Sequence, residues 1–397
     1  MIWAGCDLGR RVERRPARRG FASLRGTAAA SGAQRGVDAH LMLALAEGFG
    51  EGLVPALLAP DLDPLALLAA QPEPPAVPPR IAFRLRDPQL PARAAALRRD
   101  AAAHGLHLLE PDHPAWPAQF AAMPLRPLVL FARGDLRALQ RQPAAAFVGS
   151  RTPTPYGTEA AQLLATALAR AGVTLWSGLA RGIDGIAHTA CADAQVPTVA
   201  VLAGGLDTIY PPEHEALAER ILATGGCLLA ELPPGHRARR GHFPRRNRLL
   251  AVGTSAVVVV EASLLSGALH TARFAAEHGA DVFALPGPWS SERSQGCHRL
   301  VTEGARLIEG PEALLRDLGV QVQQSGATAQ QLAGSADEVA ILQQLQHGPR
   351  PSDLLQRESG LDRATFLRAL FALHGRGALT RLAGDLWSRG GTTATSR

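Results

Sequence analysis

Lysine is absent from the sequence, and all 41 strongly basic side chains are arginines. Alanine and proline are very common, so this arginine use indicates a biased composition as much as selection for guanidinium chemistry. Without lysine the chain has no GK[ST] step of a P-loop, and it also lacks an ordered G-x-G-x-x-G with an acidic ribose contact. We therefore expect no nucleotide cofactor.

Cysteine and long apolar runs are also scarce. The cysteines are Cys6, Cys191, Cys227 and Cys297. Their wide spacing excludes the paired ligands of a zinc site and the density of a disulfide scaffold. No run approaches the roughly 18 apolar residues of a membrane span, and no apolar stretch of signal-peptide length follows the amino terminus. We expect a cytoplasmic protein with reduced thiols, no bound metal and no membrane contact.

The net charge of +6 is unevenly distributed along the chain. Residues 1–36 hold eight arginines against Asp7 and Glu13, and the remainder is balanced, with 33 basic and 33 acidic side chains. We predict that residues 1–36 form a disordered basic tail or precede the true start, with a nucleic-acid-binding arm as the sharper alternative. The clearest local cluster is GHRARRGHFPRRNR at 235–248, with six arginines and no acid.

At 397 residues, the chain is long enough for two or three domains. Proline-rich and polar stretches suggest the boundaries between them. The predicted divisions are the tail at 1–36, a small helical module at 37–70, a linker and lead-in at 71–109, the main domain at 110–320, a second linker at 321–335 and a winged helix at 336–390. The winged helix is predicted from three helical patterns followed by a short pair of strands.

The third helix of that last domain, residues 362–374, occupies the position that often binds DNA in winged helices. It carries Arg363 and Arg368 as its basic residues. A protein-binding role for the domain is equally open on this pattern.

Six short apolar runs divide the main domain, with amphipathic helical stretches between several of them. They lie at 144–149, 173–176, 198–202, 227–231, 256–261 and 281–285. Strands that are buried on both faces and separated by helices are typical of a parallel, doubly wound sheet. The fold class is therefore α/β and Rossmann-like.

Glycine-rich loops follow these runs, where an open parallel sheet binds its ligands. In the first loop, Gly149 allows close backbone approach, Ser150 offers a hydroxyl and Arg151 offers a bidentate fork to phosphate. The four loops are VGSRTPTPYG (148–157), SGLARGIDGIAH (177–188), AGGLD (203–207) and EASLLSGALHTA (261–272). With the arginines of RRNR (245–248), they predict a pocket that binds several phosphates.

A series of motifs resembles the DNA-processing protein A family, also called DprA or Smf. In order, they are VGSR with PYG, SGLARGIDGIAH, VAVLAGGLDTIYPPEH, FPRRNRLLA, VVVVEASLLSGALHTA, LPGP and GCHRLVTEGA. The resemblance covers roughly 110–310 and implies a Rossmann-like core, with the flanking segments as a small SAM-like helical module and a winged helix.

The resemblance also implies a function. Members of the family bind single-stranded DNA taken up in natural transformation, protect it, and load the RecA recombinase onto it as homodimers formed through the Rossmann-like domain. No catalytic residue is implied. Carried over by motif, the DNA-binding residues are Gly149, Ser150, Arg151, Gly178, Arg181, Gly182, Arg245, Arg246, Asn247, Arg248, Ser266, Gly267 and Thr271. In this interpretation RRNR forms the wall of the groove, with its guanidinium groups on successive phosphates.

The sequence departs from the family pattern at His270 and at Cys297–His298, which we expect at the edge of the pocket. Several residues also have a structural interpretation. Asp184 and Asn247 are candidates for helix caps, His188 for a packed helix residue and Arg248 for a partly buried structural arginine. Because the tryptophans are widely separated in the sequence, an aromatic platform for bases is not expected.

An enzymatic alternative is a nucleoside-monophosphate N-glycosidase of a related Rossmann-like type. Such a reaction requires a carboxylate near the sugar. Glu231 and Glu261 are the candidates at strand ends. However, EASLLSGALHTA stands where the PGG-x-GT-x-x-E loop of those enzymes would fall, so the binding protein is the favoured interpretation.

Overall fold

The computed structural model describes residues 39–49, 68, 78–123, 126–320, 334–345, 348–376, 378–382 and 385–389. The predictions for the tail at 1–36, for most of the helical module at 37–70 and for most of the linker at 321–335 lie outside the described residues. The chain divides into two compact units, Met1–Gln321 and Val322–Arg397, and each is described here by itself.

A sheet of nine strands forms the centre of the first unit, in the order β1-β2-β6-β5-β4-β3-β7-β8-β9. The strands are β1 (His107–Leu109), β2 (Leu130–Gly134), β3 (Ala144–Val148), β4 (Thr174–Ser177), β5 (Val199–Leu202), β6 (Cys227–Ala230), β7 (Ala256–Val259), β8 (Asp281–Ala284) and β9 (Arg306–Leu307). From β6 to β9 all neighbours are parallel, and β1 and β2 extend the sheet in antiparallel fashion beside β6. All six predicted strands are present, and the predicted fold class is confirmed.

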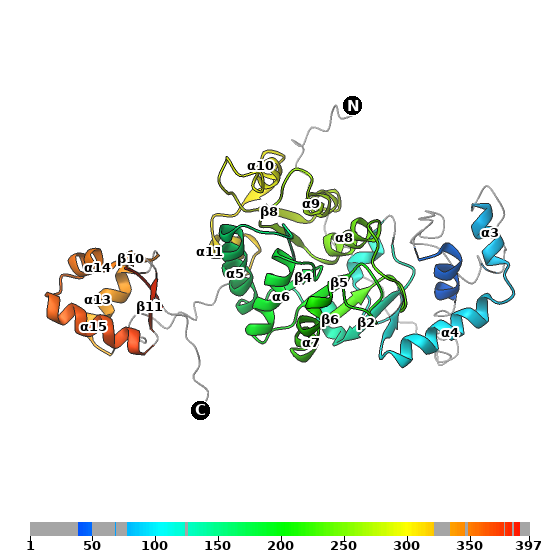
Figure 1. Ribbon diagram of the computed structural model, residues 1–397, viewed down its shortest axis with the longest axis horizontal. Helices are drawn as coiled ribbons and strands as arrows, with labels where there is room; N and C mark the ends of the chain where they lie inside the picture. Colours follow the sequence, from blue (N-terminus) through cyan, green and yellow to red (C-terminus); the bar gives the residue numbers. More distant parts are fainter. Residues whose placement is uncertain are drawn as a thin grey trace, which may run out of the picture. The chain divides into compact units, whose positions relative to one another are not determined.

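Helices cover both faces of the sheet (Figure 1). One layer holds α5 (Pro155–Arg170), α6 (Ile183–Asp193), α7 (Glu215–Ala223) and α11 (Pro311–Asp317); the other holds α8 (His242–Gly253), α9 (Gly267–Glu277) and α10 (Gln295–Thr302). Short 3-10 turns are η2 (Ala118–Ala122), η3 (Leu136–Gln140) and η4 (Pro212–His214). Strands β3 to β7 are buried on both faces because each layer packs an apolar core against them, which explains their unbroken apolar sequences.

The direction of the chain reverses at β3. After β3 the chain adds β4, β5 and β6 toward one edge, and then returns to place β7 on the other side of β3. The loop after β3 enters α5 on one face, whereas the loop after β7 leads to α9 on the opposite face. Two loops that diverge in this way leave a crevice between them, which is where open α/β sheets bind their ligands.

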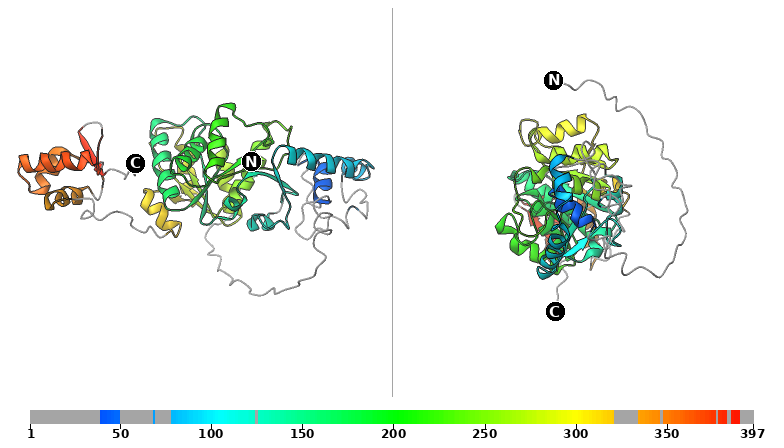
Figure 2. Two further views of the ribbon diagram at one scale, coloured as in Figure 1. Left: turned by 90° about the horizontal axis from the view of Figure 1, so that it is seen from below. Right: turned by 90° about the vertical axis from the view of Figure 1, so that its right-hand side faces the viewer.

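The region expected as a linker and lead-in, 71–109, contains two helices, α3 (Pro79–Leu85) and α4 (Leu90–Ala103). They share an apolar cluster with the helical residues 39–47, which lie beside α4 in Figures 1 and 2. The linker interpretation was wrong for these helices because both carry proline in the first turn, where its fixed φ and missing N–H are compatible with a helix.

The second unit has the predicted order of three helices and a pair of strands. These are α13 (Ala336–Gln344), α14 (Ser352–Ser359), α15 (Arg363–Gly375), β11 (Leu379–Leu382) and β12 (Leu386–Arg389), and β10 (Arg350–Pro351) joins the sheet beside β12. Asp362 caps α15 by accepting hydrogen bonds from the amides of Ala364 and Thr365. Across the described parts of both units, none of the helices combines the length and the apolar character required to cross a bilayer.

Candidate nucleic-acid interface

An open pocket of about 460 Å³ lies at the carboxyl edge of the sheet, in the crevice between the loops after β3 and β7. It brings together most of the residues that the sequence proposed for DNA. Predicted residues in its wall are Gly149, Ser150, Arg151, Arg246, Asn247, Ser266, Gly267 and Thr271. Gly178, Arg181, Gly182, Arg245 and Arg248 are not part of this wall.

The loop after β3 is anchored from below by a carboxylate. Glu261, at the end of β7, accepts hydrogen bonds from the amide of Thr154 at 2.9 Å and from its hydroxyl. The Thr154 hydroxyl in turn accepts from the Gly157 amide and caps α5. This anchor fixes the first turn of α5, and the Glu261 carboxylate lies at the amino end of that helix.

Arg293 is a pocket residue that the sequence analysis missed. Its guanidinium Nη1 donates to Ser150 Oγ at 3.0 Å and to Thr152 Oγ1 at 2.7 Å, so it braces the loop after β3 from the loop after β8. The sequence did offer a signal, because the loop that follows the predicted strand at 281–285 should reach the same edge of the sheet as the other loops. Arg293 was missed because it stands outside the recognised motifs.

The loop after β4 packs behind the pocket. Gly182 has φ +74°, and a Cβ there would overlap the carbonyl oxygen of Ser150. Asp184 accepts hydrogen bonds from the amides of Gly178 at 3.1 Å and Ala180 at 3.4 Å, so its role is to hold this loop. Burial raises the pKa of the Asp184 carboxyl, although Arg246 acts in the opposite direction. Gly178 and Gly182 therefore shape the main pocket without lining it, and Gly178 lines a second pocket beside it.

Arg246 lies on the floor of the pocket and is buried. It donates to the carbonyl oxygens of Gly178, at 2.7 Å, and of Val201, and its Nε donates to Asn247 Oδ1 at 3.1 Å. Burial lowers the pKa of Arg246 to about 10, with Asp184 opposing the shift, so the group stays charged at neutral pH. A fixed positive charge thus lies beneath the pocket.

The other two arginines of RRNR do not form a groove wall. Arg248 is buried and donates to both carboxylate oxygens of Glu231, and Arg245 pairs with the same carboxylate, with Nε 3.1 Å from Oε2. Arg245 also donates to the carbonyl oxygen of Phe49 in the amino-terminal helical segment. The structural interpretation of Arg248 therefore fits its surroundings, and Arg245 ties that segment to the core.

The amino end of α9 forms the opposite wall. Ser266 caps the helix by accepting from the Ala268 amide at 3.2 Å, and His270 also lines the pocket. The expectation that Cys297 and His298 lie at the pocket edge is wrong. Cys297 is buried with its Sγ facing the backbone of β7, and His298 Nε2 lies 3.0 Å from the Gly287 carbonyl oxygen.

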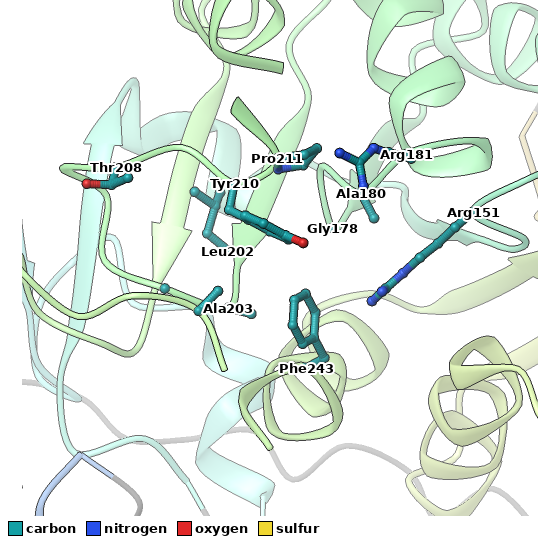
Figure 3. A pocket seen from close by; sticks show the side chains of 12 residues that line it. Arg151, Gly178, Ala180, Arg181, Leu202, Ala203, Thr208, Tyr210, Pro211 and Phe243 are labelled. Atoms are coloured by element: carbon teal, nitrogen blue, oxygen red, sulfur yellow. The ribbon is translucent and has the colours of Figure 1, made fainter. Parts of the chain in front are cut away.

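A second, narrower pocket adjoins the first, and Arg151, Ala180 and Phe243 line both. Figure 3 shows Arg151 extended toward Phe243, with Tyr210 on the other side of the space. The Arg151 guanidinium carbon lies 4.8 Å from the centre of the Phe243 ring, and the Phe243 and Tyr210 rings are 6.3 Å apart. Tyr210 and Phe243 are thus an aromatic pair that the sequence analysis did not foresee.

Arg181 lines this second pocket and is exposed. Its guanidinium group pairs with Glu213, which raises the pKa of the arginine. An exposed ion pair of this kind contributes little to stability. Arg181 is therefore placed to extend the positive surface beyond Arg151.

The two carboxylates considered for glycosidic cleavage have other partners. Glu231 is held by Arg245 and Arg248, and Glu261 is held by Thr154. Asp184 is the acidic residue in the wall of the main pocket, and it is engaged with loop amides. Within the described residues, no group of three His, Cys, Asp or Glu side chains is placed to hold a metal ion.

His188 on α6 is a buried structural residue, as predicted for a packed helix position. Its Nδ1 donates to Thr198 Oγ1 at 3.0 Å, and the Thr198 hydroxyl donates onward to the Leu175 carbonyl oxygen. Burial lowers the pKa of His188 to about 3. The folded protein therefore holds this imidazole neutral throughout the range in which an unfolded histidine gains a proton.

The low pKa of His188 predicts an acid-labile fold. Stability from this residue is present above pH 6.5, the unfolded value, and falls as the pH drops toward 3. Lowering the pH from about 7.5 to about 5 should cost about 2 kcal/mol through this residue. Urea unfolding at both pH values measures the loss, which His188→Gln should reduce and His107→Gln, at an exposed position, should leave in place. Equal losses in wild type and His188→Gln would contradict the assignment.

The crevice outside the carboxyl ends of the strands, the amino end of α9 and the buried Arg246 define a Rossmann-like protein with a cationic pocket at its topological switch point. Residues 107–319 match the family described as DNA recombination-mediator protein A, and residues 322–385 match the DprA winged helix domain. The chain belongs to the DNA recombination-mediator protein A family.

Named relatives agree with this assignment. Protein Smf of Escherichia coli is 44% identical over 212 residues, which are 53% of this chain and 56% of that protein. A putative DNA processing protein DprA of Mycobacterium tuberculosis is 42% identical over 288 residues, 70% of this chain and 68% of its own length. The crystal structure of DNA processing protein A from Streptococcus pneumoniae has a TM-score of 0.57 at 29% identity and covers 70% of this chain and 97% of that chain. The chain thus spans little more than half of the Escherichia coli protein.

Proposed function

We propose that this protein binds single-stranded DNA, with consecutive phosphates in the main pocket at the carboxyl edge of the sheet. The observation that carries the proposal is the convergence of Arg151, Arg246 and Arg293 on one open crevice at the amino end of α9. Guanidinium groups and helix amino ends are the groups that bind phosphate in proteins. Because phosphate contacts carry no base information, binding should tolerate most sequences.

The adjoining aromatic pair favours a single strand over a duplex. The ring faces of Tyr210 and Phe243 suit unpaired bases, which stack on aromatic side chains, whereas the bases of a duplex are already stacked on one another. A backbone that follows Arg151 from the main pocket into the second one would bring its bases to these rings. Arg181, Gly178 and Gly182 support this path, and Arg245 and Arg248 hold α8 beneath it.

Membership of the recombination-mediator family supports the wider role. We propose that the protein protects incoming or processed single strands in the cytoplasm and hands them to the RecA recombinase, in natural transformation or in recombination more generally. We further propose a homodimer formed through the Rossmann-like domain. The winged helix would assist as an accessory contact to DNA or protein.

Fluorescence anisotropy of a labelled poly-dT strand tests the proposal. We expect tight binding at low salt that weakens steeply as salt rises, because phosphate binding releases counterions. Unlabelled single strand should compete, and duplex of equal length should compete poorly. Absence of binding at moderate salt by the folded protein would contradict the proposal.

Incubation of the same purified protein with nucleoside monophosphates distinguishes the binding function from the glycosidase alternative. A glycosidase would release free base from nucleoside monophosphates, and a binder of long strands would leave them intact. The engagement of Glu231 and Glu261 with other residues favours the binder. Chromatography of nucleotides incubated with the protein gives the answer directly.

A further inference from the structure

Large apolar side chains are exposed on two loops beside the main pocket. Leu264 and Leu265, after β7, are 48% and 96% exposed, and Trp289, after β8, is 87% exposed. Tryptophan is rarely left in water when it has no ligand, since its ring gains more from burial than most side chains do. The other tryptophans in the described part of the chain, Trp116, Trp176 and Trp387, are all buried.

The two loops lie side by side and border the pocket. The Ala262 amide donates to the Arg293 carbonyl oxygen, and the Gly296 amide donates to the Ala262 carbonyl oxygen, both at 2.8 Å. Leu264 and Leu265 stand between Ser263 and Ser266, which line the pocket. Arg293 lines it from the loop that carries Trp289, so both loops with exposed apolar side chains also contribute residues to the pocket wall.

The loop that carries Trp289 is anchored at its base. Tyr156 Oη donates to the Pro286 carbonyl oxygen at 2.7 Å, and His298 Nε2 lies 3.0 Å from the Gly287 carbonyl oxygen. A turn closed by the Ser291 amide and the Pro288 carbonyl oxygen, at 3.0 Å, presents Trp289 at its tip. Presenting the indole on an anchored turn reduces the entropy lost when a ligand packs against it.

We propose that Trp289, with Leu264 and Leu265, forms a contact surface for nucleobases of the strand whose phosphates occupy the main pocket. This inference rests on the proposed function. It places base contacts on the α9 and α10 side of the crevice, opposite the Tyr210 and Phe243 pair. A DNA strand whose phosphates bind in the main pocket would then pack some bases against Trp289 and others against Tyr210 and Phe243.

Nucleobases fit this surface better than a lipid or a folded partner does. The apolar side chains are few and border a cationic pocket, whereas protein interfaces require a broad apolar core. A base offers a flat apolar face of indole size next to a phosphate, and stacking on tryptophan tolerates every base. The chemistry of the surface thus matches the two halves of a nucleotide.

A strand without bases tests the proposal. Binding of a poly-dT strand is compared with binding of an abasic deoxyribose-phosphate strand of equal length, for wild type, Trp289→Ala and Trp289→Phe. We expect Trp289→Ala to weaken poly-dT binding by about five- to tenfold, to leave abasic binding unchanged, and to be largely rescued by phenylalanine. Poly-dT should also quench the exposed indole in wild type, and Trp289→Phe should lose that quenching.

Matched controls remove an exposed apolar side chain elsewhere in the same unit. Phe83→Ala on α3 and Leu163→Ser on α5, at residues that are 80% and 58% exposed, should bind both strands as wild type does, whereas Leu265→Ser should weaken poly-dT alone. Unchanged poly-dT affinity in Trp289→Ala, or an equal loss with both strands, would overturn the inference. A change of oligomeric mass with unchanged strand affinity would overturn it in favour of self-association. Failure of wild type to bind either strand would overturn the proposed function itself.

Discussion

Replacing Arg248 with alanine should lower the free energy of unfolding by about 3 kcal/mol, because it breaks a buried ion pair and leaves the Glu231 carboxylate with the less buried Arg245 in place of two arginine partners. Arg248 and Glu231 are both buried, and the guanidinium group donates to both carboxylate oxygens. Burial lowers the pKa of Arg248, and the carboxylates of Glu231 and Glu47 oppose that shift, as expected for a buried charge held by acidic neighbours. Urea denaturation at pH 7.5 measures the loss.

The matched control is Arg299→Ala. Arg299 also pairs with a glutamate, Glu303, but its side chain is 51% exposed, so the change should cost less than about 1 kcal/mol. Similar small losses for both variants would show that the Arg248–Glu231 pair does not hold α8 in the folded protein. A stable Arg248→Ala variant with weakened DNA binding would instead indicate that Arg248 contacts DNA in the groove.

Removing the guanidinium groups of Arg151 and Arg293 together should weaken single-strand binding about 100-fold or more at low salt, since each charge-assisted contact contributes about 1.5–3 kcal/mol. The slope of log affinity against log salt should also become shallower by about 1.4, corresponding to two phosphate contacts. Anisotropy titrations of a poly-dT strand across a salt series measure both quantities.

A double variant with the same charge change provides the control. Arg141 and Arg170 are exposed, and they lie at the start of β3 and at the end of α5, on the opposite edge of the sheet. Arg141→Ala with Arg170→Ala should lose far less affinity, through long-range electrostatics alone. Equal losses in the two double variants would show that the protein holds DNA through its general charge and not in the pocket.

The sheet was largely predictable from the sequence, for a physical reason. Strands buried on both faces have uninterrupted apolar sequences, and this identified β3 to β7. The apolar run of β8 also identified that strand, although Asp281 at its start is exposed. Strands β1 and β9 are short, and β9 is exposed, so neither leaves such a pattern. The return of the chain to place β7 beside β3 depends on which strands pair, which composition and periodicity do not specify.

The loops that form the pocket were predictable from the sequence, whereas the identity of the arginines that line it was less so. Arg245 and Arg248 are three residues apart on α8 and therefore share a face, which meets Glu231 at the end of β6. Arg246 points elsewhere, toward Gly178. The sequence alone shows four basic and polar residues in a row, and the depth and rotation of the helix against the sheet decide which of them face a ligand.

Pocket residues outside the recognised motifs could be identified only from the structure. Arg293 reaches Ser150 from a loop that lies more than a hundred positions along the chain, and Tyr210 meets Phe243 only because their loops converge at one edge of the sheet. Separation in sequence carries no information about such contacts. The expectation against an aromatic platform for bases was based on the spacing of the tryptophans, and it did not consider Tyr210 and Phe243.

The most direct test of DNA binding in the main pocket is a crystal structure of the protein with a short poly-dT strand. We expect consecutive phosphates within hydrogen-bonding distance of Arg151 and Arg293, above the buried Arg246, with Arg245 and Arg248 still paired with Glu231. A strand bound at another surface, with this crevice empty of phosphate, would contradict it.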